Sequence, residues 1–560
     1  MSEMLTAVAI IFIIAGPFLL LANRYNLPAA PMLIIGGLFA GFFIDEELLL
    51  QLAQFGIALL VFAFGVSIQL SDLQTVFRDS ELAAFAQILV LGLIGMGLGI
   101  ALGLSPGEAM FVGVAVALSS TIVATALLQT EIHTDLIRGR LGRSIQFLQD
   151  IFAVMFLLAM GAGVLELDPI VLQLGYGVVF LGAAAIVNYH VFPWITRLAG
   201  GSVELMVIGV ISTLVVFIGA AMAVEVPMVV GAFAVGLAIR HDRAAYHGLF
   251  NGIESIKDFF VAIFFATVGA LVVLPFVELE VAASVEKLIL VLVIVVLVVI
   301  VKPAVTTAIL LYRGYEARTA TLTGLSTDQV SEFALIIAIE ALILGFLTDA
   351  VFDAIILAAA ITMITSSLTQ RYAEDIYRSL ADRGVLSERH GKIDALSEVH
   401  EDISDHVIVA GYGRKGRQVV DMLEEHGHPY VVIENDPALR DDLRLECESY
   451  VFGDATDKYT WEKARAETAK VIISVTGSQV VSRRLLNFDF DAGLILRAPD
   501  ERVALELLDE GALYVVVPDL LASEQLIKHL SALFSGEMTR SELRAEGLAL
   551  LGIDEPSGGR

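Results

Sequence analysis

Residues 288–307 read LILVLVIVVLVVIVKPAVTT, a stretch in which the only charged side chain belongs to Lys302. A helix that spans the hydrocarbon core of a bilayer needs about 20 mostly apolar residues. This stretch therefore predicts a membrane-spanning helix, and the rest of the chain can be compared with it.

Similar apolar runs, separated by short charged breaks, fill residues 1–372. We count thirteen, which begin near Met4, Pro28, Leu49, Leu82, Glu108, Arg143, Gln173, Val203, Val226, Lys257, Lys287, Thr319 and Asp349. The first run lacks a basic segment before it, so we interpret it as a span rather than a signal peptide. The chain is 57% hydrophobic and 18% charged, whereas soluble proteins carry about 25% charged residues. This composition excludes a purely cytosolic enzyme and predicts a polytopic, all-helical membrane domain over residues 1–372.

Basic residues are unevenly distributed among the breaks of the membrane domain. With an external N-terminus and thirteen spans, eleven of the thirteen Lys and Arg in residues 1–370 fall in cytoplasmic loops: Arg24, Arg78, Arg138, Arg140, Arg143, Arg197, Arg240, Arg243, Lys257, Arg313 and Arg318. Only Lys287 falls in an external loop, and Lys302 lies within a span. Cytoplasmic loops are enriched in Lys and Arg. The distribution predicts a multi-pass protein of the cell membrane with its N-terminus outside and its C-terminal domain in the cytoplasm.

The composition changes after Tyr372. We expect a charged helical connector over residues 373–403, a nucleotide-binding domain over residues 404–535 and an acidic tail over residues 536–560. The predicted nucleotide-binding domain contains six short β-branched runs, HVIVAG, PYVVIEN, SYVFGD, AKVIISVTG, GLILRA and LYVVVPD, which alternate with amphipathic helical segments. This alternation predicts a parallel, doubly wound, Rossmann-like sheet. The formal net charge of −28 argues against a nucleic-acid partner, and a single cysteine, Cys447, excludes a disulfide framework.

A glycine-rich motif follows the first predicted strand. Residues 411–416 read GYGRKG, in which Gly411 permits a tight turn, Gly413 lets a phosphate approach the backbone and Gly416 allows close packing of helix on strand. Glu434 ends the second strand and could bind ribose hydroxyls. Other candidate nucleotide-binding residues are Arg414 in the loop and Asp454 and Thr456 after the third strand. The motif predicts an adenine-nucleotide site, although a sheet that keeps the glycines only for its turns is the alternative.

Ionisable groups inside the membrane domain are candidate functional residues, because they are costly to bury in a bilayer. Asp150 lies within the sixth run, where Gln146, Gln149 and Asp150 fall at positions i, i+3 and i+4 and so share one face of the helix. A carboxylate beside an amide oxygen suits a dehydrated monovalent cation or, alternately, a proton. Lys302 either snorkels to the interface or pairs with a buried carboxylate such as Asp150.

Two of the predicted spans contain polar clusters. The fifth includes Ser119, Ser120, Thr121 and Thr125, and the twelfth includes Ser326, Thr327, Asp328, Gln329, Ser331 and Glu332. Because one cluster lies in each half of the membrane domain, we expect inverted repeats whose discontinuous helices cross at an ion site. An acid such as Glu332 could neutralise the positive end of a broken helix. Ordinary hydrogen bonding between helices is the alternative for the Ser and Thr residues.

These features together resemble the monovalent cation:proton antiporter-2 family, specifically Kef-type potassium/proton antiporters with a regulator-of-potassium-conductance (RCK) domain. The resemblance rests on LPAAPMLIIGGLFAG, LAQFGIALLVFAFGVSIQL, ALSSTIVATALL, FLQDIFAV, GAFAVGLAI, FFATVG, DQVSEFAL, VIVAGYGRKG and GDAT. It implies a homodimer, with Gln149 and Asp150 as the ion-binding pair, Ser119, Thr121 and Glu332 beside it, and electroneutral exchange. It also implies that AMP, ATP or NAD(H) binds the soluble domain. A membrane lysine occurs in sodium/proton relatives, but Lys302 is not securely aligned with it.

The sequence therefore predicts a secondary transporter that exchanges K⁺ or Na⁺ for protons and is regulated by nucleotide. A nucleotide-gated potassium channel is the main alternative, although residues 1–372 contain no filter sequence like TVGYG. A membrane-bound dehydrogenase is the third possibility, and it lacks a catalytic constellation after the glycine motif.

Overall fold

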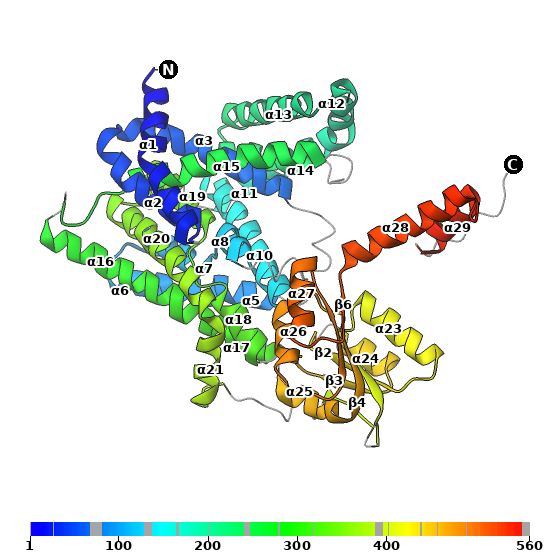
Figure 1. Cartoon of the computed structure of the whole chain (residues 1–560). Helices are drawn as coiled ribbons and strands as arrows, with labels where there is room; N and C mark the ends of the chain where they lie inside the picture. The colour runs from blue at the N-terminus through cyan, green and yellow to red at the C-terminus, as the bar shows by residue number, and fades with distance from the viewer. Residues whose placement is uncertain are drawn as a thin grey trace. The chain divides into compact units, whose positions relative to one another are not determined.

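The computed structural model describes residues 2–25, 27–67, 81–127, 137–163, 167–200, 202–239, 247–277, 280–315, 317–386, 396–400, 402–436, 439–455, 457–488 and 490–550. The chain forms two compact units (Figure 1). One holds the described residues up to 386, and the other holds those from 396 onwards. The first unit is helical and the second contains the sheet.

The first unit consists of helices. They are α1 (Ser2–Tyr25), α2 (Ala29–Ala40), η1 (Gly41–Phe43), α3 (Glu46–Ser67), α5 (Glu81–Ala86), η2 (Gln87–Leu91), α6 (Gly92–Ala101), α7 (Pro106–Ala117), α8 (Thr121–Leu127), α10 (Ile137–Met160), α11 (Leu167–Ile186), η3 (Val187–Val191), α12 (Phe192–Ala199), α13 (Val203–Ala223), α14 (Met228–Ala238), α15 (His247–Ala270), α16 (Val281–Val296), η4 (Leu297–Val301), α17 (Lys302–Arg313), α18 (Ala317–Leu325), α19 (Glu332–Ile343), α20 (Asp349–Arg371) and α21 (Ala373–Asp382). Of these, η1 is a 3₁₀ turn, and η2, η3 and η4 are π-helical turns within longer helices.

The helical membrane domain is as predicted, but the number of spans is smaller by length and composition. Within the described ranges, nine helices are long and apolar enough to cross a membrane. The runs that correspond to α2 and α14 form shorter apolar helices, Ala29–Phe43 and Met228–Ala238. The twelfth run is divided into α18 and α19, and α15 carries three charged residues in its first half. Thirteen spans therefore remain a prediction.

The fifth and twelfth runs are interrupted helices, and serines define where the second halves begin. α7 ends at Ala117, Leu118 is extended with φ −81° and ψ 144°, and α8 starts at Thr121. Ser120 Oγ accepts a hydrogen bond from Val123 N at 3.1 Å. In the other run, Ser331 caps α19 by accepting from Phe333 N at 3.0 Å. Serine is a favoured residue at such positions because its hydroxyl satisfies a free backbone N–H group.

Glycines bring α2 and α15 into close contact. A Cβ atom on Gly37 would lie 1.9 Å from the carbonyl oxygen of Ala266, and one on Gly269 would lie 2.0 Å from that of Ile34. Small residues allow backbones to approach closely where helices pack in a membrane. The segments LIIGGLFAG and FFATVG, far apart in sequence, therefore meet as one helix pair.

The second unit alternates strands and helices. Its elements are β1 (His406–Ala410), α23 (Arg414–Glu425), β2 (Tyr430–Glu434), α24 (Arg440–Glu446), β3 (Tyr450–Phe452), α25 (Lys458–Lys463), η6 (Ala466–Thr468), β4 (Ala469–Ser474), α26 (Gln479–Leu486), β5 (Gly493–Arg497), α27 (Glu501–Asp509), β6 (Tyr514–Val516), α28 (Pro518–Ser535) and α29 (Arg540–Leu550). All six predicted strands are present.

The six strands form one parallel sheet in the order β3-β2-β1-β4-β5-β6. This order reverses direction beside β1, where doubly wound folds place their ligands. Ile408 and Val409 of β1 are completely buried, because helices cover both faces of such a sheet. The parallel Rossmann-like sheet is thus confirmed. Upstream of it, Glu398 forms an antiparallel bridge with Tyr450 of β3, so this part of the predicted connector pairs with the sheet edge.

Candidate functional site

The two helix interruptions of the first unit contact each other directly. Ser119 Oγ donates to the carbonyl oxygen of Thr327 at 3.2 Å, and Gln329 Nε2 donates to that of Ser120 at 3.2 Å. Both pairs are buried and more than 200 residues apart in sequence. The predicted polar clusters therefore meet at one place, which we call the helix-break site, defined by residues 118–121 and 326–332.

Lys302 is fully buried at this site. Its ammonium group donates to the carbonyl oxygens of Leu118 at 2.8 Å and Gln329 at 3.0 Å, and to Ser119 Oγ at 3.3 Å. Leu118 follows the last residue of α7, so the cation lies at the negative end of that helix. No ion pair joins Lys302 to Asp150 in the described ranges. The ion pair with Asp150 that the sequence suggested is therefore not formed by these residues. The Lys302 ammonium group is buried and does not extend to the membrane surface.

Glu332 lies at the N-terminus of a helix, which is the positive end of the helix dipole. One of its carboxylate oxygens, Oε1, accepts from Thr121 Oγ1 at 2.5 Å and from Ile122 N at 3.1 Å, both in the first turn of α8. Free N–H groups give a helix N-terminus a partial positive charge, which a carboxylate stabilises. Glu332 is also the first residue of α19. Its other oxygen, Oε2, is buried and has no hydrogen-bond partner among the described residues.

Gln149 and Asp150 reach the same site from α10, and both are buried. Gln149 Oε1 accepts from Ser119 N at 2.8 Å, and its Nε2 donates to the carbonyl oxygen of Ala117 at 3.2 Å and to Gln87 Oε1. The Gln149 amide thus holds α10 against the break after α7. Asp150 has Glu332 and Thr121 as electrostatic neighbours. Its Oδ2 atom is buried without a hydrogen-bond partner in the described part of the chain.

In the second unit, the glycine motif connects β1 to α23 as predicted. Gly411 has φ 103°, a conformation that favours glycine. A Cβ atom on Gly416 would lie 2.0 Å from the carbonyl oxygen of Gly411, so only glycine fits there, whereas a Cβ on Gly413 would meet nothing within 4 Å. Arg414 is the exposed first residue of α23. The open backbone at Gly413 and the N-terminus of α23 form a surface that an anion can approach.

Glu434, at the end of β2, binds the backbone of this glycine loop. Its Oε2 accepts from Tyr412 N at 2.7 Å, and its Oε1 accepts from Asn435 N at 2.8 Å and Asp436 N at 3.0 Å. Burial raises the pKa of Glu434, although the three backbone donors act in the opposite direction. The two oxygens offer about four lone-pair sites, of which one on Oε2 remains free, so a ribose hydroxyl could still donate to Oε2. Asp454 follows β3 and is buried, and Thr456 lies outside the described residues.

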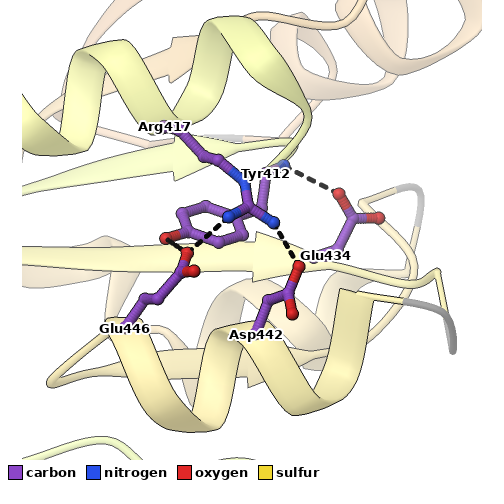
Figure 2. A network of polar contacts seen from close by, with 5 residues as sticks. All are labelled: Tyr412, Arg417, Glu434, Asp442 and Glu446. Carbon is purple, nitrogen blue, oxygen red and sulfur yellow. Dashed lines mark hydrogen bonds and ion pairs between the residues drawn. The ribbon is translucent and has the colours of Figure 1, made fainter.

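Figure 2 shows a polar network beneath the loop that the sequence did not indicate. Tyr412 packs its ring under the guanidinium of Arg417, whose carbon lies 4.8 Å from the ring centre. Glu446 accepts from Tyr412 Oη at 2.8 Å and from Arg417 Nη1 at 2.6 Å, and Asp442 accepts from Arg417 Nη2. Burial and Glu446 raise the pKa of Tyr412, and Asp442 raises that of Arg417. The network connects the glycine loop to α24.

Comparison with known families gives a consistent assignment. Residues 8–371 match the transmembrane sodium/hydrogen exchanger family, and residues 407–519 match the TrkA-N domain. The chain belongs to the sodium/hydrogen exchanger family. The exchanger domain followed by a TrkA-N domain confirms the resemblance drawn from the sequence motifs.

Two relatives align with this exchanger-family chain over more than nine-tenths of its length. It is 26% identical to the cation/proton antiporter YbaL of Escherichia coli (strain K12), over 93% of this chain and 96% of the relative. It is 26% identical to the K(+) efflux antiporter KefB of Alkalimonas amylolytica, over 91% of this chain and 78% of that one. The solved TrkA-N domain of the Escherichia coli inner membrane protein ybaL shares 26% identity, covering 23% of this chain and 98% of that chain with a TM-score of 0.22.

From the sequence we missed two residues that adjoin the helix-break site of the exchanger domain, Gln87 and Thr306. Gln87 lies in the π-helical turn η2 and is fully buried. Its Nε2 donates to Thr306 Oγ1 and lies 3.4 Å from Thr327 Oγ1. Thr306 in turn donates to the carbonyl oxygen of Lys302 at 2.8 Å. The available signals were a single glutamine inside an apolar run and a threonine four residues after Lys302. π-Helical turns occur frequently at functional sites.

A buried ion pair between Lys287 and Asp353 of the exchanger domain corrects one prediction. Lys287, expected in an external loop, lies inside α16, and its side chain is 2% exposed. Its ammonium group contacts Asp353 Oδ2 of α20 at 2.5 Å and donates to the carbonyl oxygen of Val273 at 3.0 Å. The buried carboxylate compensates the buried charge, which explains how a lysine is accommodated among apolar residues. The number of Lys and Arg residues in the predicted external loops therefore changes from one to zero.

Proposed function

We propose that this protein is a secondary transporter that exchanges K⁺ or Na⁺ for protons, one for one, at Asp150. The observation that carries the proposal is the Asp150 carboxylate oxygen that is buried without a partner at the helix-break site. A buried, uncompensated carboxylate is unfavourable. A proton or a monovalent cation would neutralise it equally well, and the two cannot occupy the same oxygen together. This competition couples the two fluxes.

The surrounding residues have separate roles in this proposal. Lys302 and Glu332 compensate the negative end of α7 and the positive end of α8, so these broken helices stay stable without lipid or water contact at their inner ends. Gln149 orients α10 by its bonds to Ser119 and Ala117. One carboxylate that carries either one proton or one cation has the same net charge in both loaded forms, which supports electroneutral exchange.

Potassium is supported as a substrate by the name of the KefB relative, a K(+) efflux antiporter. We further propose a homodimer with an external N-terminus and a cytoplasmic C-terminal domain. In that domain, an adenine nucleotide (AMP, ATP or NAD(H)) binds near Gly411, Gly413, Arg414 and Glu434 and regulates exchange. The open backbone at Gly413 and the acid that follows β2 support this site.

The experiment is cation-driven proton flux in proteoliposomes that contain the full-length protein, with K⁺ and Na⁺ compared. Asp150→Asn is expected to reduce the flux to the level of protein-free vesicles, because an amide cannot alternate between a proton and a cation. Asp349→Asn, the same substitution at an exposed position in the first turn of α20, is the control and should retain wild-type flux. Full exchange by Asp150→Asn would refute the assignment.

A further inference from the structure

Asp328 is a further buried acid of the helix-break site, and the exchange mechanism above does not use it. It is fully buried, and neither of its carboxylate oxygens has a hydrogen-bond partner among the described residues. An ionised carboxylate in that situation is strongly unfavourable unless a proton or cation compensates it.

The neighbouring donors are already used. The three protons of the Lys302 ammonium group are directed at Leu118, Gln329 and Ser119. Lys302 therefore acts on Asp328 through space rather than by a hydrogen bond.

Two hydroxyl groups of α20 complete the surroundings of Asp328. Ser366 and Thr369 lie near its carboxylate, three residues apart on one face of the helix. Ser366 Oγ donates its proton to Gln329 Oε1 at 3.0 Å, and Thr369 Oγ1 donates to the carbonyl oxygen of Thr365 at 3.0 Å. Each hydroxyl carries one proton, which it can give either to that acceptor or to Asp328. When the proton goes to the other acceptor, the hydroxyl oxygen presents its lone pairs beside the carboxylate. A carboxylate with two neighbouring hydroxyl oxygens is the kind of all-oxygen ligand set that hard cations prefer.

The position of Asp328 relative to Asp150 follows from α10. Gln146 Nε2 contacts the carbonyl oxygen of Ser326 at 3.4 Å, and Gln146 precedes Asp150 by four residues, about 6 Å of helix rise. Ser366 and Thr369 lie in the last two turns of α20, which ends at Arg371. Asp328 therefore lies on the side of Asp150 that faces the Arg143 end of α10 and the Arg371 end of α20.

We propose that Asp328, Ser366 and Thr369 form a second monovalent-cation site, which holds a cation before it moves to Asp150. The proposal relies on the exchange function above only for the identity of the ion. A cation bound at this site is not itself exchanged for a proton until it reaches Asp150, so exchange at Asp150 remains one for one.

Equilibrium binding of ⁸⁶Rb⁺ and ²²Na⁺ to the purified full-length protein tests the site, at alkaline pH so that protons do not compete. We expect two bound ions per protomer for the wild type and for Asp349→Asn, one for Asp328→Asn, one for Asp150→Asn and none for the double variant. Wild-type stoichiometry and affinity in Asp328→Asn would overturn the proposal.

A milder variant covers the possibility that Asp328→Asn does not fold. Thr369→Val preserves the side-chain shape and removes one oxygen. We expect the affinity for one of the two bound ions to fall about tenfold, equivalent to ~1.4 kcal/mol. Two unchanged affinities in Thr369→Val would also overturn the second site. Absence of proton flux from the wild type in proteoliposomes would instead refute the exchange function, and it would leave the binding stoichiometry to decide the Asp328 site.

Discussion

The buried pair of Lys287 and Asp353 permits a quantitative test of how the membrane domain is held together. Their side chains are only 2% and 1% exposed, and Asp353 also accepts from Val273 N at 3.3 Å through its other oxygen. Replacing Lys287 by Met removes the cation and leaves the carboxylate buried. Breaking a buried pair in this way costs about 3–5 kcal/mol, whereas replacing both members by apolar residues is often neutral.

We therefore expect Lys287→Met and Asp353→Leu each to be strongly destabilised, and Lys287→Met/Asp353→Leu to regain most of the loss. The assay is thermal unfolding of the detergent-purified protein, monitored by size-exclusion chromatography of heated samples. The three variants and the wild type are compared as a double-mutant cycle. The difference between the double variant and the sum of the single variants measures the coupling. A double variant that is as unstable as the sum of both single variants would refute the reasoning, because the two residues would then act independently.

Three further predictions concern the second unit. Gly416→Ala is expected to destabilise this unit and abolish nucleotide binding, since its Cβ would lie 2.0 Å from the Gly411 carbonyl oxygen; normal melting and binding by isothermal titration calorimetry would contradict this. Gly413→Ala is expected to keep wild-type stability but to bind nucleotide at least about tenfold more weakly, because its Cβ has free space in the structure and would occupy the approach of a phosphate; undiminished affinity would argue against the site. Burial raises the pKa of the Cys447 thiol to about 11, so its thiolate fraction at pH 8 should be about 100-fold below that of a free cysteine; alkylation of the native protein by iodoacetamide at the rate of free cysteine would show that the thiol is accessible and ionised.

Parts of the site could be predicted because their signals are local. The strand before Gly411 and the helix after it both lie within residues 406–425, so the glycine motif and its fold context are visible together. The helix interruptions were likewise indicated by Ser and Thr clusters within apolar runs, and Ser120 and Ser331 indeed provide hydrogen bonds to the first turns of α8 and α19.

Other parts could not be predicted because they depend on partners distant in sequence. Lys302 and the Leu118 carbonyl are 184 residues apart, and Gln149 and Gln87 are 62 residues apart. A lysine in an apolar run is compatible with snorkelling, an ion pair or hydrogen bonds to backbone carbonyls, and only the arrangement of α7, α17 and the break before α19 selects the third. The misplacement of Lys287 has the same origin, since its partner Asp353 is 66 residues away.

The sequence by itself determined the division into a helical membrane domain and a parallel α/β domain, because the length and period of apolar runs are set by the bilayer and by backbone geometry. It also indicated three of the buried acids, Asp150, Asp328 and Glu332, though not Asp353, since a carboxylate in an apolar run is costly wherever the run packs. Only the tertiary structure decided which charges compensate one another. Compensation requires atoms within a few ångströms, and packing alone brings α7, α10, α17, α19 and α20 to that distance.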